Sequence, residues 1–223
     1  HTIQQMAEGA IARRLRVLAI TDHSAGLGIV NGLDAERLRQ QRLEIDAVQA
    51  RLGDKIRLLQ GAEVEIHADG SLDHPDEVLE SLDIVIASLH TSLRQPREQV
   101  TARLLKAMNN PHVDIIGHPT GRLMPDREGA DLDMEQVLQA AKENGVALEI
   151  NCSPSRLDLD EVYARRAAEM EIPLAINTDA HSTAQLDYAE LGVSVARRGW
   201  VWPMLVVNTW SEDWLMDWLR GRG

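Results

Sequence analysis

Short apolar runs alternate with segments of helical periodicity along almost the whole chain. This alternation is typical of βα units, in which parallel strands form a sheet and the intervening helices cover it. We expect strands over residues 16–21, 56–66, 81–90, 113–119, 146–151 and 174–176. We expect helices over residues 2–14, 34–53, 96–108, 133–144 and 159–170. The order predicts an α/β barrel or doubly wound sheet that lacks the strand expected before its first helix.

Residues that favour helix ends support these boundaries. Thr2 followed by Gln5 forms a capping-box pair at the start of the first helix. Asp34 and Asp133 stand where a carboxylate caps the first turn of a helix, and Gly53 stands where a helix is expected to stop.

The composition predicts one globular domain. A chain of 223 residues suits a single α/β barrel, and no apolar run approaches the roughly 18 residues that cross a bilayer. The first residues lack the pattern of a secretory signal. The single cysteine, Cys152, excludes an internal disulfide and favours a cytoplasmic setting, and we expect it to be an ordinary barrel residue.

The formal net charge of −12 at pH 7 argues against a broad face that binds nucleic-acid phosphates without sequence preference. We therefore expect any nucleic acid to be held locally, by bound cations or by another domain.

Side chains that ligate metals recur where the expected strands end. They are Asp22, His23, Glu63, His90, His118, Asp179 and His181. Because the carboxyl ends of parallel strands form one rim, we expect these residues to converge in space. A lone histidine at a strand end is more often a structural hydrogen-bonding residue, but recurrence in five units predicts a metal site. Glu65 and His67 are expected on a solvated turn, whereas Glu149 and Asn151 suit either a supporting role behind the ligands or simple packing.

Imidazoles and carboxylates without thiolates favour Zn, Mn or Fe over a structural cysteine-type zinc site. The candidate ligands outnumber the three that one catalytic zinc needs, which predicts more than one ion. Paired ions about 3.5–4 Å apart stabilise the attacking and leaving oxygens when a phosphoester is displaced. The pattern therefore favours phosphoester chemistry.

The motifs ITDHS, GAEVEI, SLH, GHP and INTDAH occur in this order and at intervals that resemble the PHP domain, a family named for polymerases and histidinol phosphatase. The segments GHPTGRL, LEINCSPSRLDL, NTDAHSTAQLDY and ARRGW followed by VVNT are similar to the C-terminal PHP domain of bacterial family X DNA polymerases. The resemblance covers essentially the whole chain. It implies one domain over residues 1–223, with a distorted TIM-like (β/α)7 barrel and three divalent ions, Mn, Zn or Fe, at its carboxyl rim.

The resemblance also implies a set of ligands. Glu63 corresponds to a bridge between two ions, of which one is completed by His90 and His118 and the other is bound by Asp179. The two remaining ligands, assigned to the third ion, are His23 and His181.

In the family, further ligands come from an opening strand with an H-x-H motif, which this sequence lacks. We interpret the lack as truncation, with natural loss of the motif as the alternative, and expect polymerase domains upstream in a longer protein.

Arg122 and Arg156 are candidates for holding substrate phosphate, because a guanidinium matches phosphate oxygens bidentately. Either arginine suits a surface ion pair equally well.

The leading hypothesis is a metal-dependent phosphoesterase acting on nucleic-acid ends, such as a 3′-5′ exonuclease or 3′ end-processing activity that serves a repair polymerase. One alternative is a phosphatase for a small monoester, as in the histidinol-phosphatase branch of the family. Another is a PHP module that docks on a polymerase without cleaving anything. Trp210, Trp214 and Trp218 recur every four residues, which predicts packing of a helix on the core or, less often, a docking face.

Overall fold

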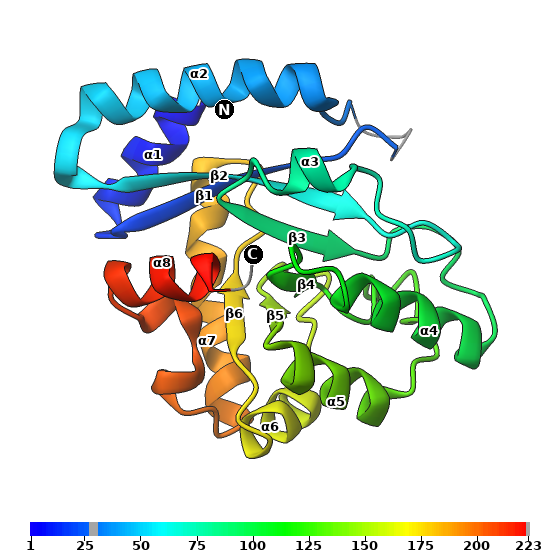
Figure 1. The fold of residues 1–223 in the computed structure, drawn as a ribbon. Helices are drawn as coiled ribbons and strands as arrows, with labels where there is room; N and C mark the ends of the chain where they lie inside the picture. The colour runs from blue at the N-terminus through cyan, green and yellow to red at the C-terminus, as the bar shows by residue number, and fades with distance from the viewer. Residues whose placement is uncertain (27–30, 222–223) are drawn as a thin grey trace.

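The computed structural model describes residues 1–26 and 31–221 (Figure 1). Within this part of the chain, six parallel strands form one sheet in sequence order. They are β1 (Val17–His23), β2 (Arg57–Glu65), β3 (Ile84–Ser88), β4 (Ile115–Gly117), β5 (Ala147–Asn151) and β6 (Leu174–Asn177). The α-helices are α1 (Ile3–Ala12), α2 (Ala35–Leu52), α3 (Asp76–Leu79), α4 (Arg97–Met108), α5 (Met134–Asn144), α6 (Glu161–Glu169), α7 (Ala189–Arg198) and α8 (Glu212–Arg220). Short 3₁₀ helices cover Gly53–Lys55, Thr183–Tyr188, Pro203–Leu205 and Val207–Thr209.

The strands curl into a half-barrel and alternate with helices along the chain, as Figure 1 shows. The predicted alternation and the order of all six strands are confirmed. Between the strand expected at 16–21 and the helix expected at 34–53, residues 27–30 lie outside the described residues.

Helix ends follow the predicted caps, with one difference. Thr2 and Gln5 form the expected capping box, and the Asp34 side chain accepts from a backbone amide of the first turn of α2. The first helix ends at Ala12 rather than near Arg14, because Arg14 takes a left-handed conformation with φ 61° that no α-helix continues.

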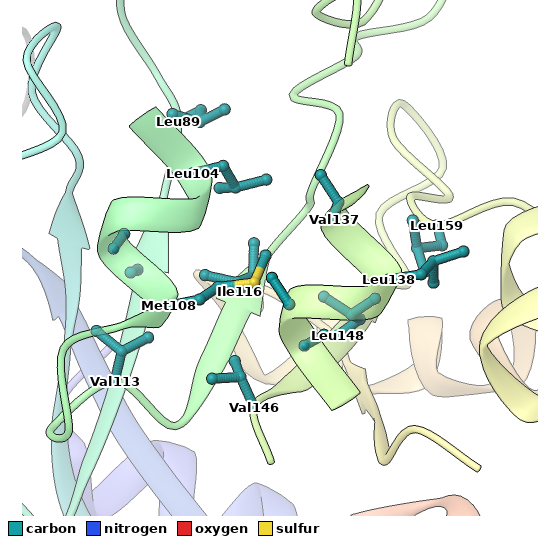
Figure 2. Close-up of a cluster of buried hydrophobic side chains, with 14 of the residues drawn as sticks. Leu89, Leu104, Met108, Val113, Ile116, Val137, Leu138, Val146, Leu148 and Leu159 are labelled. Carbon is teal, nitrogen blue, oxygen red and sulfur yellow. The ribbon is translucent and has the colours of Figure 1, made fainter. Parts of the chain in front are cut away.

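The outer face of the sheet carries the largest apolar cluster, where β2–β5 meet the helices (Figure 2). The side chains labelled there are Leu89, Leu104, Met108, Val113, Ile116, Val137, Leu138, Val146, Leu148 and Leu159. Because β3 is buried on both faces, its sequence reads as a continuous apolar run and not as an alternating one.

The inner face changes from apolar to polar along each strand. Successive side chains of a strand point to opposite faces, so Leu59 and Glu63 of β2 share the inner face, as do Ala147 and Glu149 of β5. The apolar end packs against α8 through Leu219. The polar end of the inner face, at the carboxyl rim, is not covered by this packing.

The predicted packing of the three recurring tryptophans on the core is observed in part. Trp210 precedes α8 and stacks on Trp214, with ring centroids 4.2 Å apart, while Trp218 packs against the inner-face cluster. Trp214 remains 49% exposed. No helix in the described part of the chain has the length and apolarity that crossing a membrane requires.

Candidate metal centre

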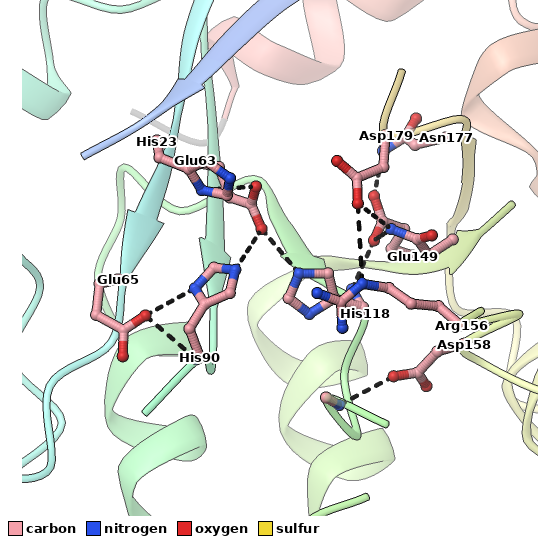
Figure 3. Close-up of polar contacts among 12 residues, drawn as sticks. His23, Glu63, Glu65, His90, His118, Glu149, Arg156, Asp158, Asn177 and Asp179 are labelled. Atoms are coloured by element: carbon pink, nitrogen blue, oxygen red, sulfur yellow. Dashed lines mark hydrogen bonds and ion pairs between the residues drawn. The ribbon is translucent and has the colours of Figure 1, made fainter. Parts of the chain in front are cut away.

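Four of the predicted ligands meet at the carboxyl rim (Figure 3). His23 ends β1 and Glu63 lies near the end of β2, while His90 and His118 follow β3 and β4. Their convergence results from the parallel register, which pairs His23 directly with Glu63. Asp22 alternates away from the site, and its carboxylate accepts a hydrogen bond from Gln41 of α2.

The Glu63 carboxylate is the centre of this group. Its Oε1 lies 3.2 Å from Nε2 of His90 and 2.9 Å from Nε2 of His118. Its Oε2 lies 3.2 Å from Nδ1 of His23. The rings of His90 and His118 meet edge to face with centroids 4.9 Å apart, so one carboxylate faces three imidazoles.

Nitrogen atoms in this group lack hydrogen-bond partners. Nδ1 of His23, Nε2 of His90 and both ring nitrogens of His118 are buried without a hydrogen bond to any described residue. The three nitrogens beside Glu63 approach its oxygens closely, but not in a hydrogen-bonding direction. An unpartnered buried nitrogen is costly, and a cation between the imidazoles and the carboxylate would satisfy these atoms. His23, Glu63 and His90 also bring their ligand atoms within 4.8 Å of one another, so this donor set fits a divalent metal.

The electrostatics favour an ionised Glu63. Burial raises the pKa of its carboxyl, but the contacts with His118 and His90 outweigh burial and hold the pKa well below the usual value. Burial lowers the pKa of His23. Burial also lowers the pKa of His90, yet its contacts with Glu63 and Glu65 outweigh this effect and raise the pKa to about 9.

Asp179 and His181 form a second group after β6. The Asp179 carboxylate lies 3.3 Å from Nδ2 of Asn151 and 3.8 Å from Nε of Arg156. His181 is exposed, and its ring centroid is 6.4 Å from that of His23. The two residues therefore border the Glu63 group, and their role as ligands stays a prediction.

Two residues of the rim have strained backbones. His118 has φ 26° and Asp179 has φ 51°, a region that residues with a side chain rarely adopt. Such strain concentrates at functional sites, where the surroundings hold the residue in place.

Glu149 and Asn151 support the rim from β5. The Glu149 carboxylate accepts from the backbone amide of His118 at 2.6 Å and from Nδ2 of Asn177 at 3.0 Å. Burial, with the nearby Asp179 and Glu63 charges, raises the pKa of Glu149 to about 7 although the proximity of His118 opposes this.

The two candidate phosphate-binding arginines differ in their surroundings. Arg122 donates from Nε to the carbonyl oxygen of Arg156 at 2.7 Å and from Nη2 to that of Leu157. Its Nη1 lies 3.6 Å from Asp160. Arg156 donates from Nη1 to the carbonyl oxygen of Arg122 at 3.3 Å, and its Nε faces Asp179. Arg122 thus holds the loop that carries Arg156, and phosphate binding by either stays a prediction.

The expectation for Glu65 is wrong, because this side chain is only 2% exposed and does not lie on a solvated turn. Its carboxylate accepts from Nδ1 of His90 at 2.7 Å. The spacing of two residues from Glu63 was the available signal, since it places both carboxylates on the same face of one strand.

Cys152 behaves as predicted. It is fully buried, and burial raises the pKa of its thiol to about 12, which keeps it protonated near neutral pH.

Known proteins resemble this chain in sequence. Residues 1–153 match the PHP domain. The chain is 46% identical over 210 residues to the DNA polymerase/3′-5′ exonuclease PolX of Bacillus subtilis, a match that covers 94% of the chain and 37% of that protein. It is 34% identical over 219 residues to a probable phosphatase of Thermoanaerobacter, which covers 93% of the chain and 84% of the relative.

Solved structures share the fold. The histidinol phosphate phosphatase from Lactococcus lactis, complexed with zinc, L-histidinol and phosphate, matches with a TM-score of 0.62 and 16% identity over 91% of this chain and 89% of its own. A putative histidinol phosphatase from Listeria monocytogenes matches with a TM-score of 0.62 and 14% identity, covering 82% of this chain and 90% of its own. The family match, the identity to curated relatives and the shared fold agree, and the chain belongs to the PHP domain family.

Proposed function

We propose that this chain is a metal-dependent phosphoesterase that acts on nucleic-acid ends, as a 3′-5′ exonuclease or 3′ end-processing activity. The observation that carries the proposal is the Glu63 carboxylate facing three imidazoles whose buried nitrogens lack other partners. The identity to a polymerase/3′-5′ exonuclease supports the nucleic-acid substrate. The chain spans little more than a third of that relative, so polymerase domains in the same protein are part of the proposal.

The proposed ligands of the divalent ions, Mn, Zn or Fe, are His23, Glu63, His90, His118, Asp179 and His181. Divalent ions at such a centre polarise phosphoryl oxygens and make water a better nucleophile near neutral pH. Glu63 suits a shared ligand, because its two oxygens face different histidines.

Around the ions, the chain's own residues orient the phosphate ester. Arg156 stands beside Asp179 with a mostly buried side chain, so its guanidinium meets a phosphate oxygen without much competition from water. Arg122 keeps the Arg156 loop in place through its two backbone contacts, and its Nη1, which pairs with Asp160 at 3.6 Å, would have to share that pairing with a second phosphate contact.

A small phosphate monoester is the second candidate substrate. The probable phosphatase of Thermoanaerobacter matches over 84% of its length, and the structural neighbours are histidinol phosphatases. These relatives support a phosphomonoesterase without a polymerase.

The two substrates are separated by one experiment. The chain is loaded with Mn²⁺ or Zn²⁺ and assayed on a 3′-labelled oligonucleotide and on a small phosphate monoester. We expect cleavage of the oligonucleotide, loss of activity with a chelator, and a fall of at least about 100-fold in His118→Ala, since it removes a proposed ligand. His112→Ala, the same substitution outside the rim, is expected to keep full activity. Turnover of the monoester alone would favour the second candidate, and no turnover of either substrate would contradict both.

A further inference from the structure

A buried arginine lies behind the metal centre. Arg103 of α4 is 2% exposed and donates from Nη1 to the carbonyl oxygen of Thr91 at 2.9 Å and to Oε1 of Gln95 at 3.1 Å. Its Nε and Nη2 donate to the carbonyl oxygen of Ile66. Arg103 therefore ties the segment after β2 to the segment after β3, which carries His90.

The carboxylate nearest to Arg103 is Glu65, with Nη2 and Oε1 3.6 Å apart. A charged group buried to this extent is tolerated only when it is paired and hydrogen-bonded. Glu65 meets this condition, because its Oε1 accepts from the backbone amide of Thr91 at 3.1 Å and from the Thr91 hydroxyl at 2.6 Å.

The other oxygen of Glu65 is used by a single residue. Oε2 accepts from Nδ1 of His90 at 2.7 Å and lies 3.2 Å from the backbone amide of His90. A carboxylate that holds both the backbone and the ring of one histidine fixes the ring orientation. It also fixes the tautomer, because an ionised carboxylate only accepts, so Nδ1 must carry a proton.

We infer that Arg103 and Glu65 form a positioning unit. It keeps a proton on Nδ1 of His90, which donates that proton in a hydrogen bond to Glu65, and it leaves Nε2 free to ligate a metal. Nε2 of His90 is the nitrogen that faces Glu63 at 3.2 Å and has no hydrogen bond. This inference rests on the proposed metal centre for its consequence, since a ligating imidazole usually donates its other N–H to a carboxylate.

Glu65→Gln tests the unit with little change in shape. Glutamine offers one acceptor oxygen where Glu65 uses two, so its amino group must face either His90 or Thr91. Arg103, a donor, favours the oxygen on its own side, which turns the amino group toward Nδ1 of His90. We expect the ring proton to move to Nε2, where it blocks ligation.

The measurements are zinc affinity by competition with a chelating dye and the His90 tautomer by ¹⁵N NMR, on the full chain. For Glu65→Gln we expect zinc affinity about 10- to 100-fold weaker than in the unmodified chain, the range for residues behind a metal ligand. Asp114→Asn is the matched control, because Asp114 is also buried and accepts from the backbone amide of Val85, but at the opposite end of the strands. Its zinc affinity and its His90 tautomer are expected to stay unchanged.

The outcomes separate the inference from the proposed function. If Glu65→Gln binds zinc as tightly as the unmodified chain and keeps the Nδ1 proton, the inference is wrong while the metal centre stands. If the unmodified chain binds no zinc, the proposed metal centre is wrong. The inference is then tested by the protonation of the His90 ring in the metal-free protein. There, a protected Nδ1–H signal that disappears in Glu65→Gln supports the unit, and its absence from the unmodified chain overturns it.

NMR of the unmodified chain gives a second test, which does not depend on how the variant folds. Zinc bound to Nε2 with a proton on Nδ1 supports the inference. Zinc bound to Nδ1 overturns it.

Discussion

The arrangement around Glu63 depends on a few atoms from loops and strand ends that are far apart in sequence. Each oxygen of the carboxylate faces an imidazole nitrogen, and the backbone of His118 is held by Glu149 from the next strand. Precise placement of this kind needs support from behind, because exposed loops alone leave ligands too loose. Residues that touch no metal are therefore expected to matter for the centre.

Asp158 is one such supporting residue. Its fully buried carboxylate accepts from the backbone amide and hydroxyl of Thr120, at 3.0 and 2.9 Å, and from the amide of Gly121 at 3.0 Å. Burial raises the pKa of Asp158. The residue ties the loop after β5 to the loop that begins with His118.

We predict that Asp158→Ala lowers the free energy of unfolding by about 1–3 kcal/mol, because it leaves buried donors without an acceptor. Urea denaturation monitored by circular dichroism measures the change. Asp126→Ala, on an exposed carboxylate in the loop that begins with His118, is the control and is expected to change stability by less than about 0.5 kcal/mol. Equal stability of the two variants would contradict this role for Asp158.

At this scale the sequence predicts ligand chemistry better than it predicts burial. His23, Glu63, His90 and His118 could be selected because strand ends of a parallel sheet share one rim. The two-residue spacing from Glu63 places Glu65 on the same strand face, but it does not show that Glu65 is buried, because its partner Arg103 is 38 positions away in the sequence.

Among the elements, α8 fills the part of the half-barrel opposite the proposed metal centre. Trp218 and Leu219 pack against inward-facing residues of the strands, and Trp210 meets Trp218 edge to face with centroids 5.6 Å apart. The helix keeps water from the apolar end of the barrel and so stabilises the strands that carry the ligands.

We predict that Trp218→Ala costs about 3 kcal/mol of unfolding free energy, as expected when a packed aromatic side chain is removed. Trp214→Ala is expected to cost about 1 kcal/mol, since it removes mainly the stacking with Trp210. Trp200→Ala, at a side chain that is 76% exposed, serves as the control with little expected effect. Thermal and urea denaturation rank the three, and a larger loss in Trp214→Ala than in Trp218→Ala would show that the packing is misassigned.

Element order was predictable, whereas exact ends were less so. The strand expected over 81–90 is twice the length of β3. The residue types on either side of a buried strand do not mark where its pairing with the neighbouring strands stops. Caps such as Thr2 and Asp34 gave better boundaries, since each satisfies a specific backbone amide.

For the whole molecule, the alternation of strands and helices alone did not decide between a barrel and a doubly wound sheet. Curvature is decided by packing across the sheet, and here α8 and the segment before it occupy the inner side while the other helices cover the outside. Such contacts join distant parts of the chain and leave no local signal in the sequence. The family motifs supplied what periodicity did not.

The acidity of the molecule also bears on its substrate. A chain with net charge −12 repels nucleic acid at long range, so the proposed activity needs cations at the rim to hold a phosphate ester. Metal binding and substrate binding are therefore expected to be coupled.

The most direct test of the account is the metal content of the chain after equilibrium dialysis against Zn²⁺ or Mn²⁺, determined by elemental analysis. We predict that the unmodified chain retains metal in a fixed ratio to protein and that Glu63→Gln loses most of it, because an amide presents a single acceptor oxygen and no charge. His112→Ala is expected to retain as much metal as the unmodified chain. An unmodified chain with no metal above the dialysis buffer, or Glu63→Gln with an undiminished content, would contradict a metal centre at Glu63.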